Sequence, residues 1–159
     1  MGVPVRTSQV EALLFDLGQV IVGIDFDQAF AVWASYAGCD AQAVRGRFSQ
    51  DEPYKLHETG RISEAEYFDS LRGSLGINIC DAQFLEGWNS IFVGEMPGIA
   101  NMLEDLSARL PVYAFSNTNA AHEAYWSQQF ADTLTPLRSV FVSSTIGLRK
   151  PEPEAFEHV

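Results

Sequence analysis

The chain has 159 residues, of which 47% are hydrophobic and 19% charged, so it can form a packed core and is not a disordered protein. Its 21 acidic residues outnumber the 10 basic ones, and the formal net charge of −11 argues against a nucleic-acid groove or an anionic membrane surface as a partner. A small phosphorylated molecule remains compatible with this charge, because it needs only a few local cations.

The two cysteines, Cys39 and Cys80, are far apart and match no metal-binding or redox spacing. We expect both to be free thiols, as in a reducing compartment. No apolar run is long enough to span a bilayer. These features predict a cytoplasmic protein.

The first apolar segment, from Ala12 to Phe15, ends abruptly in Asp16, and Gly18 follows. A short apolar run before a turn signal predicts a fully buried parallel strand. Asp16 would then lie at the carboxyl end of the strand, where open α/β sheets bind their ligands. A buried carboxylate needs a cation or hydrogen-bond donors, which makes Asp16 a candidate functional residue. The alternative is an aspartate that caps a turn with its own backbone.

The next stretch, residues 25–92, shows helical periodicity and no strand pattern. Asp25 is expected to cap the first helix, which stops at Gly38, and a second helical segment is expected after Asp40. Capping is favoured over metal binding for Asp25 and its neighbour Asp27. The many aromatic residues at helical spacing are expected to form a core.

Within this stretch, Asp51 to Gly60 is predicted to be a polar loop, and His57 is expected to be solvent-exposed or capping. Ser63 and Glu66 have the spacing of a capping box, which predicts a helix after the loop. Asp81 is expected to cap a further helix.

Two more strands are predicted, at Val112–Phe115 and Ser139–Val142. Ile99 to Leu106 has the apolar spacing of an amphipathic helix, and another helix is expected from about Ala120. Near the end of the chain, Pro151 suits the first position of a helix.

Polar residues follow each predicted strand: Asp16 after the first, Ser116 and Asn117 after the second, and Lys150 after the third. The alternation of strands and helices predicts a Rossmann-like parallel α/β sheet with a helical insertion after the first strand. A carboxylate, a hydroxyl and an ammonium at one sheet edge suit a phosphoryl group, because the carboxylate can attack phosphorus and the other groups can stabilise its oxygens.

Three motifs in this order resemble the haloacid dehalogenase (HAD) superfamily of aspartate-nucleophile hydrolases. They are Phe15 to Ile21, Phe115 to Thr118, and Gly147 to Pro153. The insertion resembles the small helical cap of subfamily IA, which implies a core of residues 1–24 and 93–159 and a cap of residues 25–92. Residues 16–18, 22–26 and 58–63 are similar to the bacterial sugar-phosphatase branch that includes alpha-D-glucose-1-phosphate phosphatase.

The resemblance implies a Mg²⁺-dependent phosphohydrolase of small phosphorylated metabolites such as sugar phosphates, acting through an aspartyl-phosphate. Asp16 would be the nucleophile and a Mg²⁺ ligand, and the backbone carbonyl of Gly18 a second ligand. Ser116 and the backbone amide of Asn117 would hold the phosphoryl group. Lys150 would pair with both Asp16 and the phosphate.

The resemblance also implies that the cap closes over the leaving group, with His57 or Glu58 as candidate contacts. Most phosphatases of the superfamily carry a second aspartate, which serves as general acid and base, where this chain has Gly18. The sugar-phosphatase branch shares this glycine, so the resemblance to that branch holds. Without the second aspartate, however, the proton donor is left unassigned.

The fourth motif of the family, an acidic pair that completes the Mg²⁺ site, is absent from the 159 residues. The C-terminal strands of the family would be missing with it, which would leave an apolar sheet edge beside the Asp16 strand. We therefore expect a fragment of a longer protein, truncated before the fourth motif, with little or no phosphatase activity alone.

Two alternatives remain open. One is a metal-free 2-haloacid dehalogenase, whose aspartate attacks carbon, although the aromatic residue and the substrate-binding arginine of those enzymes have no clear match. The other is a non-catalytic HAD-like binding module. The oligomeric state is not indicated by the sequence.

Overall fold

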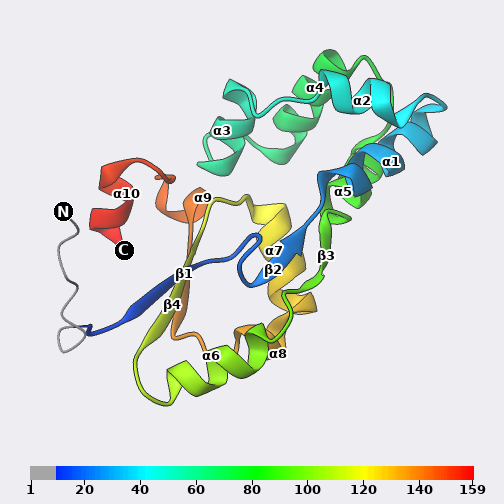
Figure 1. Ribbon diagram of the computed structural model, residues 1–159. Coiled ribbons are helices and arrows are strands. Elements are labelled where there is room, and N and C mark those ends of the chain that lie inside the picture. Colours follow the sequence, from blue (N-terminus) through cyan, green and yellow to red (C-terminus); the bar gives the residue numbers. More distant parts are fainter. Residues whose placement is uncertain (1–9) are drawn as a thin grey trace, which may run out of the picture.

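The fold is built around a three-stranded parallel sheet in the order β1-β4-β5, and the computed structural model describes residues 10–159 (Figure 1). The strands are β1 (Leu13–Asp16), β4 (Val112–Ser116) and β5 (Ser139–Val142). In the register, Asp16 lies opposite Phe115, and Ser116 lies opposite Val142, so the carboxyl ends of all three strands share one edge. The predicted Rossmann-like parallel α/β sheet is confirmed.

The first strand is less buried than predicted. β1 is an edge strand, and its residues alternate between partly buried and exposed, with Leu14 46% exposed. A strand with a neighbour on only one side and an uncovered face cannot bury every side chain. The prediction of a fully buried β1 is therefore wrong, whereas the central strand β4 buries Val112, Ala114 and Phe115 almost completely.

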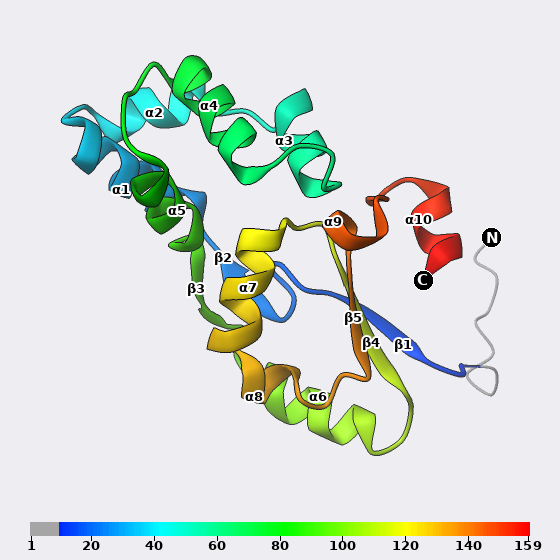
Figure 2. The same ribbon diagram turned by 180° about the vertical axis from the view of Figure 1, so that it is seen from behind.

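Helices flank the sheet and form a hydrophobic cluster with it (Figures 1 and 2). They are α6 (Ile99–Ser107), α7 (Ala120–Gln129) and α8 (Ala131–Leu134), with α9 (Ser143–Ile146) following β5 directly. The cluster joins side chains of the sheet to those of α6 and α7: Leu17, Ile21, Val22, Ile99, Leu103, Val112, Ala114, Trp126 and Val142.

The last helix, α10 (Pro153–His158), begins later than predicted. The amide of Glu152 donates a hydrogen bond to the carbonyl of Arg149 at 3.0 Å, so residues 149–152 form a turn. Pro153, not Pro151, then takes the first helical position, where its missing N–H costs nothing.

A short antiparallel ribbon joins the sheet to the helical insertion (Figure 1). It consists of β2 (Val22–Ile24) and β3 (Phe92–Glu95), with Gly23 opposite Gly94. Neither strand was predicted, because each is only three or four residues long and a central glycine breaks the alternation of apolar side chains.

The insertion is a bundle of five helices that lies above the sheet in Figure 1. Their bounds are α1 (Phe26–Ala37), α2 (Ala41–Arg47), α3 (Glu52–Glu58), α4 (Glu64–Leu75) and α5 (Asp81–Asn89). The predicted cap Asp25, the stop at Gly38, and the capping box of Ser63 with Glu66 are confirmed, and Asp40 caps α2. Asp81 is the first residue of α5, not its cap, which is Cys80.

Helix α3 replaces the polar loop predicted over Asp51 to Gly60. Asp51 caps it by accepting a hydrogen bond from the Tyr54 amide at 3.1 Å, and Pro53 lies in its first turn. The buried side of α3 consists of Tyr54, His57 and Glu58, which are polar, so the usual apolar periodicity is missing from the sequence.

The bundle has its own hydrophobic cluster, in which aromatic rings predominate. Trp33 and Trp88 stack with ring centroids 5.9 Å apart, and the Trp33 indole N–H donates to the Phe84 carbonyl at 3.0 Å. The aromatic core expected for residues 25–92 is therefore present. The domain boundaries at 24/25 and 92/93 stay a prediction.

The bundle meets α7 through a buried histidine. His122 stacks on Trp88, with ring centroids 4.6 Å apart, and its Nε2 lies 2.9 Å from the Trp88 carbonyl oxygen. Its Nδ1 lies 3.1 Å from the side-chain nitrogen Nδ2 of Asn119, the N-cap of α7. Since Asn119 can donate to Nδ1, the contacts fit a neutral ring with its proton on Nε2.

Both cysteines are free and exposed, as expected. Over residues 10–159, the structure contains no helix with the length and apolar character needed to cross a membrane.

Gly87 provides a test of the bundle core. A Cβ at this position would overlap the Trp33 indole, so we expect Gly87→Ala to lower the free energy of unfolding by about 1–3 kcal/mol through overpacking. Gly73→Ala is the matched control: Gly73 lies in α4 with nothing close to its missing Cβ, and alanine there should stabilise by up to about 1 kcal/mol. Chemical denaturation measures both. Equal effects of the two substitutions would contradict the packing described for Trp33.

His122 provides a second test. Burial lowers the pKa of His122 from 6.5 to about 3, so between these pH values the unfolded chain binds a proton that the folded chain refuses. The free energy of unfolding should therefore fall as the pH is lowered through this window, by up to about 1.4 kcal/mol per pH unit. His122→Gln should decline less steeply in denaturation curves taken from pH 7 to pH 4. Parallel declines in the two proteins would exclude this contribution. His57, whose pKa burial lowers to about 4, is present in both proteins.

Candidate active site

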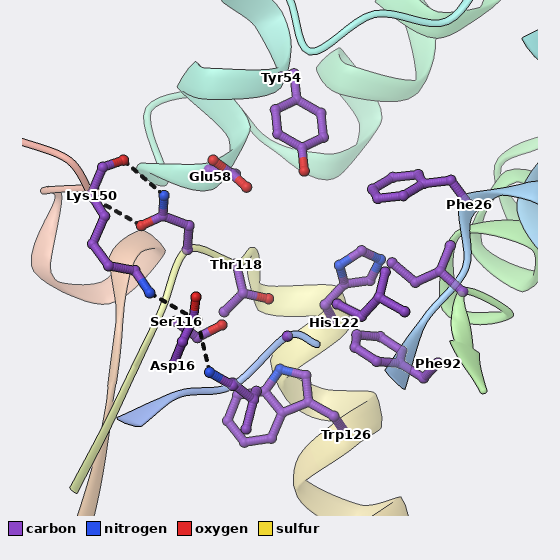
Figure 3. A pocket seen from close by; sticks show the side chains of 15 residues that line it. Asp16, Phe26, Tyr54, Glu58, Phe92, Ser116, Thr118, His122, Trp126 and Lys150 are labelled. Carbon is purple, nitrogen blue, oxygen red and sulfur yellow. Dashed lines mark hydrogen bonds and ion pairs between the residues drawn. The ribbon is translucent and has the colours of Figure 1, made fainter. Parts of the chain in front are cut away.

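A cavity of about 190 Å³ lies where the carboxyl ends of β1 and β4 face α3 of the bundle (Figure 3). Its floor is polar and its walls are largely apolar, and it opens beneath the side chains of α3. The residues that line it are Asp16, Leu17, Gly18, Ile24, Phe26, Tyr54, Glu58, Ile91, Phe92, Ser116, Asn117, Thr118, His122, Trp126 and Lys150. Six of the seven site residues predicted from the sequence are therefore brought together.

Asp16 ends β1 at the floor of the cavity. Its Oδ1 accepts a hydrogen bond from the Leu17 amide at 2.7 Å and lies 2.8 Å from the ammonium of Lys150. Within the described residues, no hydrogen bond or ion pair ends on the second oxygen, Oδ2. The side chain is 51% exposed, so the expected buried carboxylate is in fact half open to the cavity and solvent. One oxygen is thus fixed and the other is available for chemistry.

Lys150 is held by three contacts besides the one to Asp16. Its ammonium donates to the Phe115 carbonyl at 2.7 Å, and its backbone makes a reciprocal pair with the Asn117 side chain. The Lys150 amide donates to Asn117 Oδ1 at 2.8 Å, and Asn117 Nδ2 donates to the Lys150 carbonyl at 2.9 Å. Asn117, on the loop after β4, therefore fixes the backbone of Lys150 after β5.

Ser116 and Thr118 complete the polar floor, and both are almost fully buried. Ser116 lies beside Asp16 at the end of β4 (Figure 3). The Thr118 amide donates to the hydroxyl of Ser143 in α9 at 2.8 Å, and that hydroxyl donates to the Glu58 carbonyl at 2.6 Å. Ser143 thus joins the loop after β4 to the end of α3.

Glu58 and Tyr54 project from α3 into the cavity from the side opposite Asp16 (Figure 3). The guanidinium of Arg149 contacts Glu58 Oε2 through Nε at 3.0 Å and through Nη2 at 2.8 Å. Burial raises the pKa of Glu58, while Arg149, Tyr54 and Lys150 act in the opposite direction. The α3 end of the cavity is therefore a buried carboxyl group that pairs with Arg149 and lies next to the Tyr54 hydroxyl.

His57 does not line this cavity, and the structure does not bring it to the other site residues. It is 5% exposed and stacks on Tyr67, with ring centroids 4.5 Å apart, so the expectation of an exposed histidine is wrong. The error follows from the loop prediction: in helix α3, positions 57 and 58 point in different directions, and only Glu58 faces the cavity.

Gly18 packs closely against the side chain of Ile24. A Cβ there would lie 2.7 Å from Ile24 Cδ1. Among the described residues, no hydrogen bond ends on the Gly18 carbonyl, which leaves this oxygen free. The Asp16 carboxylate and the Gly18 carbonyl are hard oxygen donors of the kind that Mg²⁺ prefers, and Mg²⁺ commonly takes one or two carboxylates, with water and phosphate as further ligands. The donor set at this floor fits Mg²⁺, although residues 10–159 hold no cluster of three or more His, Cys, Asp or Glu side chains.

Several residues of the site were not identified from the sequence: Tyr54, the side-chain role of Asn117, Ser143, His122 and Arg149. The partner of the Asn117 side chain, Lys150, lies 33 positions away in the chain, and the partner of Arg149, Glu58, lies 91 positions away. Only the fold brings those partners together.

No family model matches the chain. A curated relative, D-ribitol-5-phosphate phosphatase of Bacteroides thetaiotaomicron, is 26% identical over 153 residues, covering 93% of this chain and 74% of that protein. A crystal structure of a HAD family enzyme from the same organism, in complex with magnesium and inorganic phosphate, superimposes with a TM-score of 0.78 at 26% identity. That match covers 94% of this chain and 76% of the other.

A likeness at lower identity supports the fold alone. The L-2-haloacid dehalogenase of Xanthobacter autotrophicus superimposes with a TM-score of 0.62 at 19% identity, covering 94% of this chain and 63% of that enzyme. The sheet order, the helical insertion and the three polar strand ends are consistent with these similarities. The fold and the polar strand ends of this chain are similar to those of haloacid dehalogenase superfamily enzymes.

Proposed function

We propose that this protein is a Mg²⁺-dependent phosphohydrolase that acts on phosphomonoesters of small metabolites through an aspartyl-phosphate. The observation that carries the proposal is the floor of the cavity, where Lys150 lies 2.8 Å from Oδ1 of Asp16 and Ser116 lies beside them. A carboxylate with one fixed and one free oxygen, next to a cation and a hydroxyl, suits attack on phosphorus.

In the first step, Oδ2 of Asp16 forms a bond to phosphorus and the bond to the leaving oxygen breaks. Ser116 and the backbone amide of Asn117 hold the phosphoryl oxygens, and Lys150 offsets the negative charge on them. In the second step, water displaces Asp16 and releases inorganic phosphate. The apolar walls formed by Phe26, Phe92 and Trp126 limit access of bulk water.

Asp16 and the Gly18 carbonyl would hold Mg²⁺. When bound, Mg²⁺ neutralises charge on the phosphate oxygens and helps to align them with the nucleophile. The crystallised B. thetaiotaomicron enzyme in complex with magnesium and inorganic phosphate supports this assignment.

We infer that the substrate is a sugar phosphate or sugar-alcohol phosphate. The cavity of about 190 Å³ is small beside the roughly 300–1,000 Å³ of pockets for drug-sized ligands, and the related D-ribitol-5-phosphate phosphatase acts on a compact polyol phosphate. Glucose 1-phosphate is the first sugar phosphate to test. The cytoplasmic location and the low activity expected of the 159 residues alone stay predictions.

The dehalogenase alternative has less support from the cavity. A haloacid needs a cation for its own carboxylate, and among the described lining residues there is no arginine. The nearest one, Arg149, is paired with Glu58.

Replacing the nucleophile tests the covalent step. In the full-length protein, Asp16→Asn should abolish formation of an acid-stable, hydroxylamine-sensitive phosphoenzyme and lower turnover by several orders of magnitude, because an amide is a poor nucleophile. Mass spectrometry after rapid acid quench measures the adduct. Persistence of the adduct in Asp16→Asn would place the nucleophile elsewhere. No hydrolysis by the unmodified protein over a panel of phosphomonoesters would favour the binding module.

Asn117 tests the positioning of Lys150. Asn117→Ala removes both side-chain contacts to the Lys150 backbone, so we expect kcat to fall by about 10²-fold, the scale of a misplacement near 1 Å. Lys150→Met gives the limit for complete loss of the ammonium. Turnover in Asn117→Ala equal to that of the unmodified protein would show that the other contacts suffice.

A further inference from the structure

The proposed hydrolysis of an alkyl phosphate needs a proton donor. When the bond between phosphorus and the leaving oxygen breaks, the electron pair stays on that oxygen, and an alkoxide is a poor leaving group unless it is protonated. Gly18 has no side chain and cannot supply the proton. The donor must therefore come from another part of the cavity.

Three of the candidate donors that line the cavity are poorly suited. His122 is neutral, since burial lowers its pKa to about 3, and both ring nitrogens already have partners. Burial raises the pKa of Tyr54, so its hydroxyl gives up a proton reluctantly. The Lys150 ammonium is bound to Asp16 and to the Phe115 carbonyl.

Glu58 is the remaining carboxyl group among the described lining residues besides Asp16. It enters from α3, across the cavity from the nucleophile, so a phosphate on the floor would direct its leaving group toward it (Figure 3). Both guanidinium contacts of Arg149 end on Oε2, so Arg149 does not hold Oε1, and the Tyr54 hydroxyl is the other hydrogen-bonding neighbour of the Glu58 carboxyl. The hydrogen bond from Ser143 to the Glu58 carbonyl fixes the backbone at this position.

The surroundings of Glu58 suit a group that gains and loses a proton. Burial raises its pKa, and the charged and polar groups that face it, Arg149, Lys150 and the Tyr54 hydroxyl, act in the opposite direction. A phosphate group bound on the floor adds a like charge, which raises the affinity of a carboxylate for a proton.

We propose that Glu58 is the general acid and base of the reaction, in the role that Gly18 cannot fill; this inference rests on the proposed phosphohydrolase function. In the first step, Glu58 gives its proton to the leaving oxygen as Asp16 bonds to phosphorus, and the alcohol departs. In the second step, the Glu58 carboxylate takes a proton from water as the water oxygen bonds to phosphorus. The bond to Asp16 breaks with its electron pair returning to the carboxylate, and inorganic phosphate leaves.

The test compares two substrates in the full-length protein by rapid-quench kinetics with Mg²⁺. p-Nitrophenyl phosphate has a leaving group that needs no proton, whereas glucose 1-phosphate or another alkyl phosphate does need one. In Glu58→Gln, the first turnover of the alkyl phosphate should fall by about 10²–10⁴-fold, and that of the aryl phosphate by less than about tenfold. The aryl phosphate should then give a burst of one equivalent of nitrophenolate, because the phosphoenzyme accumulates without its base.

Glu52→Gln is the matched control, since Glu52 begins the same helix, is exposed and lies outside the cavity. It should leave both first turnovers unchanged. Glu58→Ala with added formate provides a second variant: a small carboxylic acid that enters the vacated space should restore part of the alkyl phosphate turnover. A residue that only joins α3 to Arg149 would not be replaced in this way.

Equal loss on both substrates in Glu58→Gln, with no burst and no rescue of Glu58→Ala by formate, would overturn the role of Glu58 while leaving the phosphohydrolase function intact. Turnover of both substrates at the rate of the unmodified protein would do the same. If the unmodified protein hydrolyses neither substrate nor any other phosphomonoester, the proposed function fails and this inference fails with it.

Discussion

The site depends on the reciprocal pairing of the Asn117 side chain with the Lys150 backbone. It joins the loops after β4 and β5, so it sets where the ammonium stands relative to Asp16 on β1. The parallel register brings the three strand ends to one edge, but register alone does not aim a flexible lysine. The amide contacts fix its backbone, and the Phe115 carbonyl then receives the ammonium, so the cation is placed before any substrate enters.

A second set of contacts closes the cavity from above. Ser143 bonds both the Thr118 amide and the Glu58 carbonyl, and Arg149 pairs with Glu58, so α3 is attached to the same two loops that form the floor. The approach is close: a Cβ on Gly60 would overlap the Ser144 carbonyl, and Gly60 has a φ of +67° that a side chain would disfavour. Glu58 above the cavity is therefore held by Arg149, and the cation below the cavity is the ammonium of the next residue, Lys150.

The sequence predicted the sheet, because β4 and β5 are apolar runs with clear turn signals, and β5 has the predicted bounds. It also predicted the polar strand ends, since Asp16 and Ser116 close β1 and β4, whereas Lys150 follows β5 only after α9. The ribbon β2–β3 and helix α3 were missed for a shared reason: their stabilising contacts are distant in sequence. β2 pairs with a strand some seventy positions later. In α3, the buried Glu58 side chain pairs with Arg149, and the Glu58 carbonyl accepts from Ser143 of α9. Periodicity detects neither.

The energetics separate the contacts that stabilise the fold from those that serve chemistry. The pair of Asp16 and Lys150 is half exposed on the aspartate side, and ion pairs of this kind contribute only about 0–1 kcal/mol to folding. The aromatic stack of Trp33, Trp88 and His122 is buried. The stability of the bundle thus lies in its aromatic core, and the Asp16–Lys150 pair contributes little to it.

The overall charge of −11 is compatible with an anionic ligand. The electrostatic field at the floor of the cavity is set by a lysine at hydrogen-bond distance, whereas distant surface carboxylates are screened beyond about 8–10 Å.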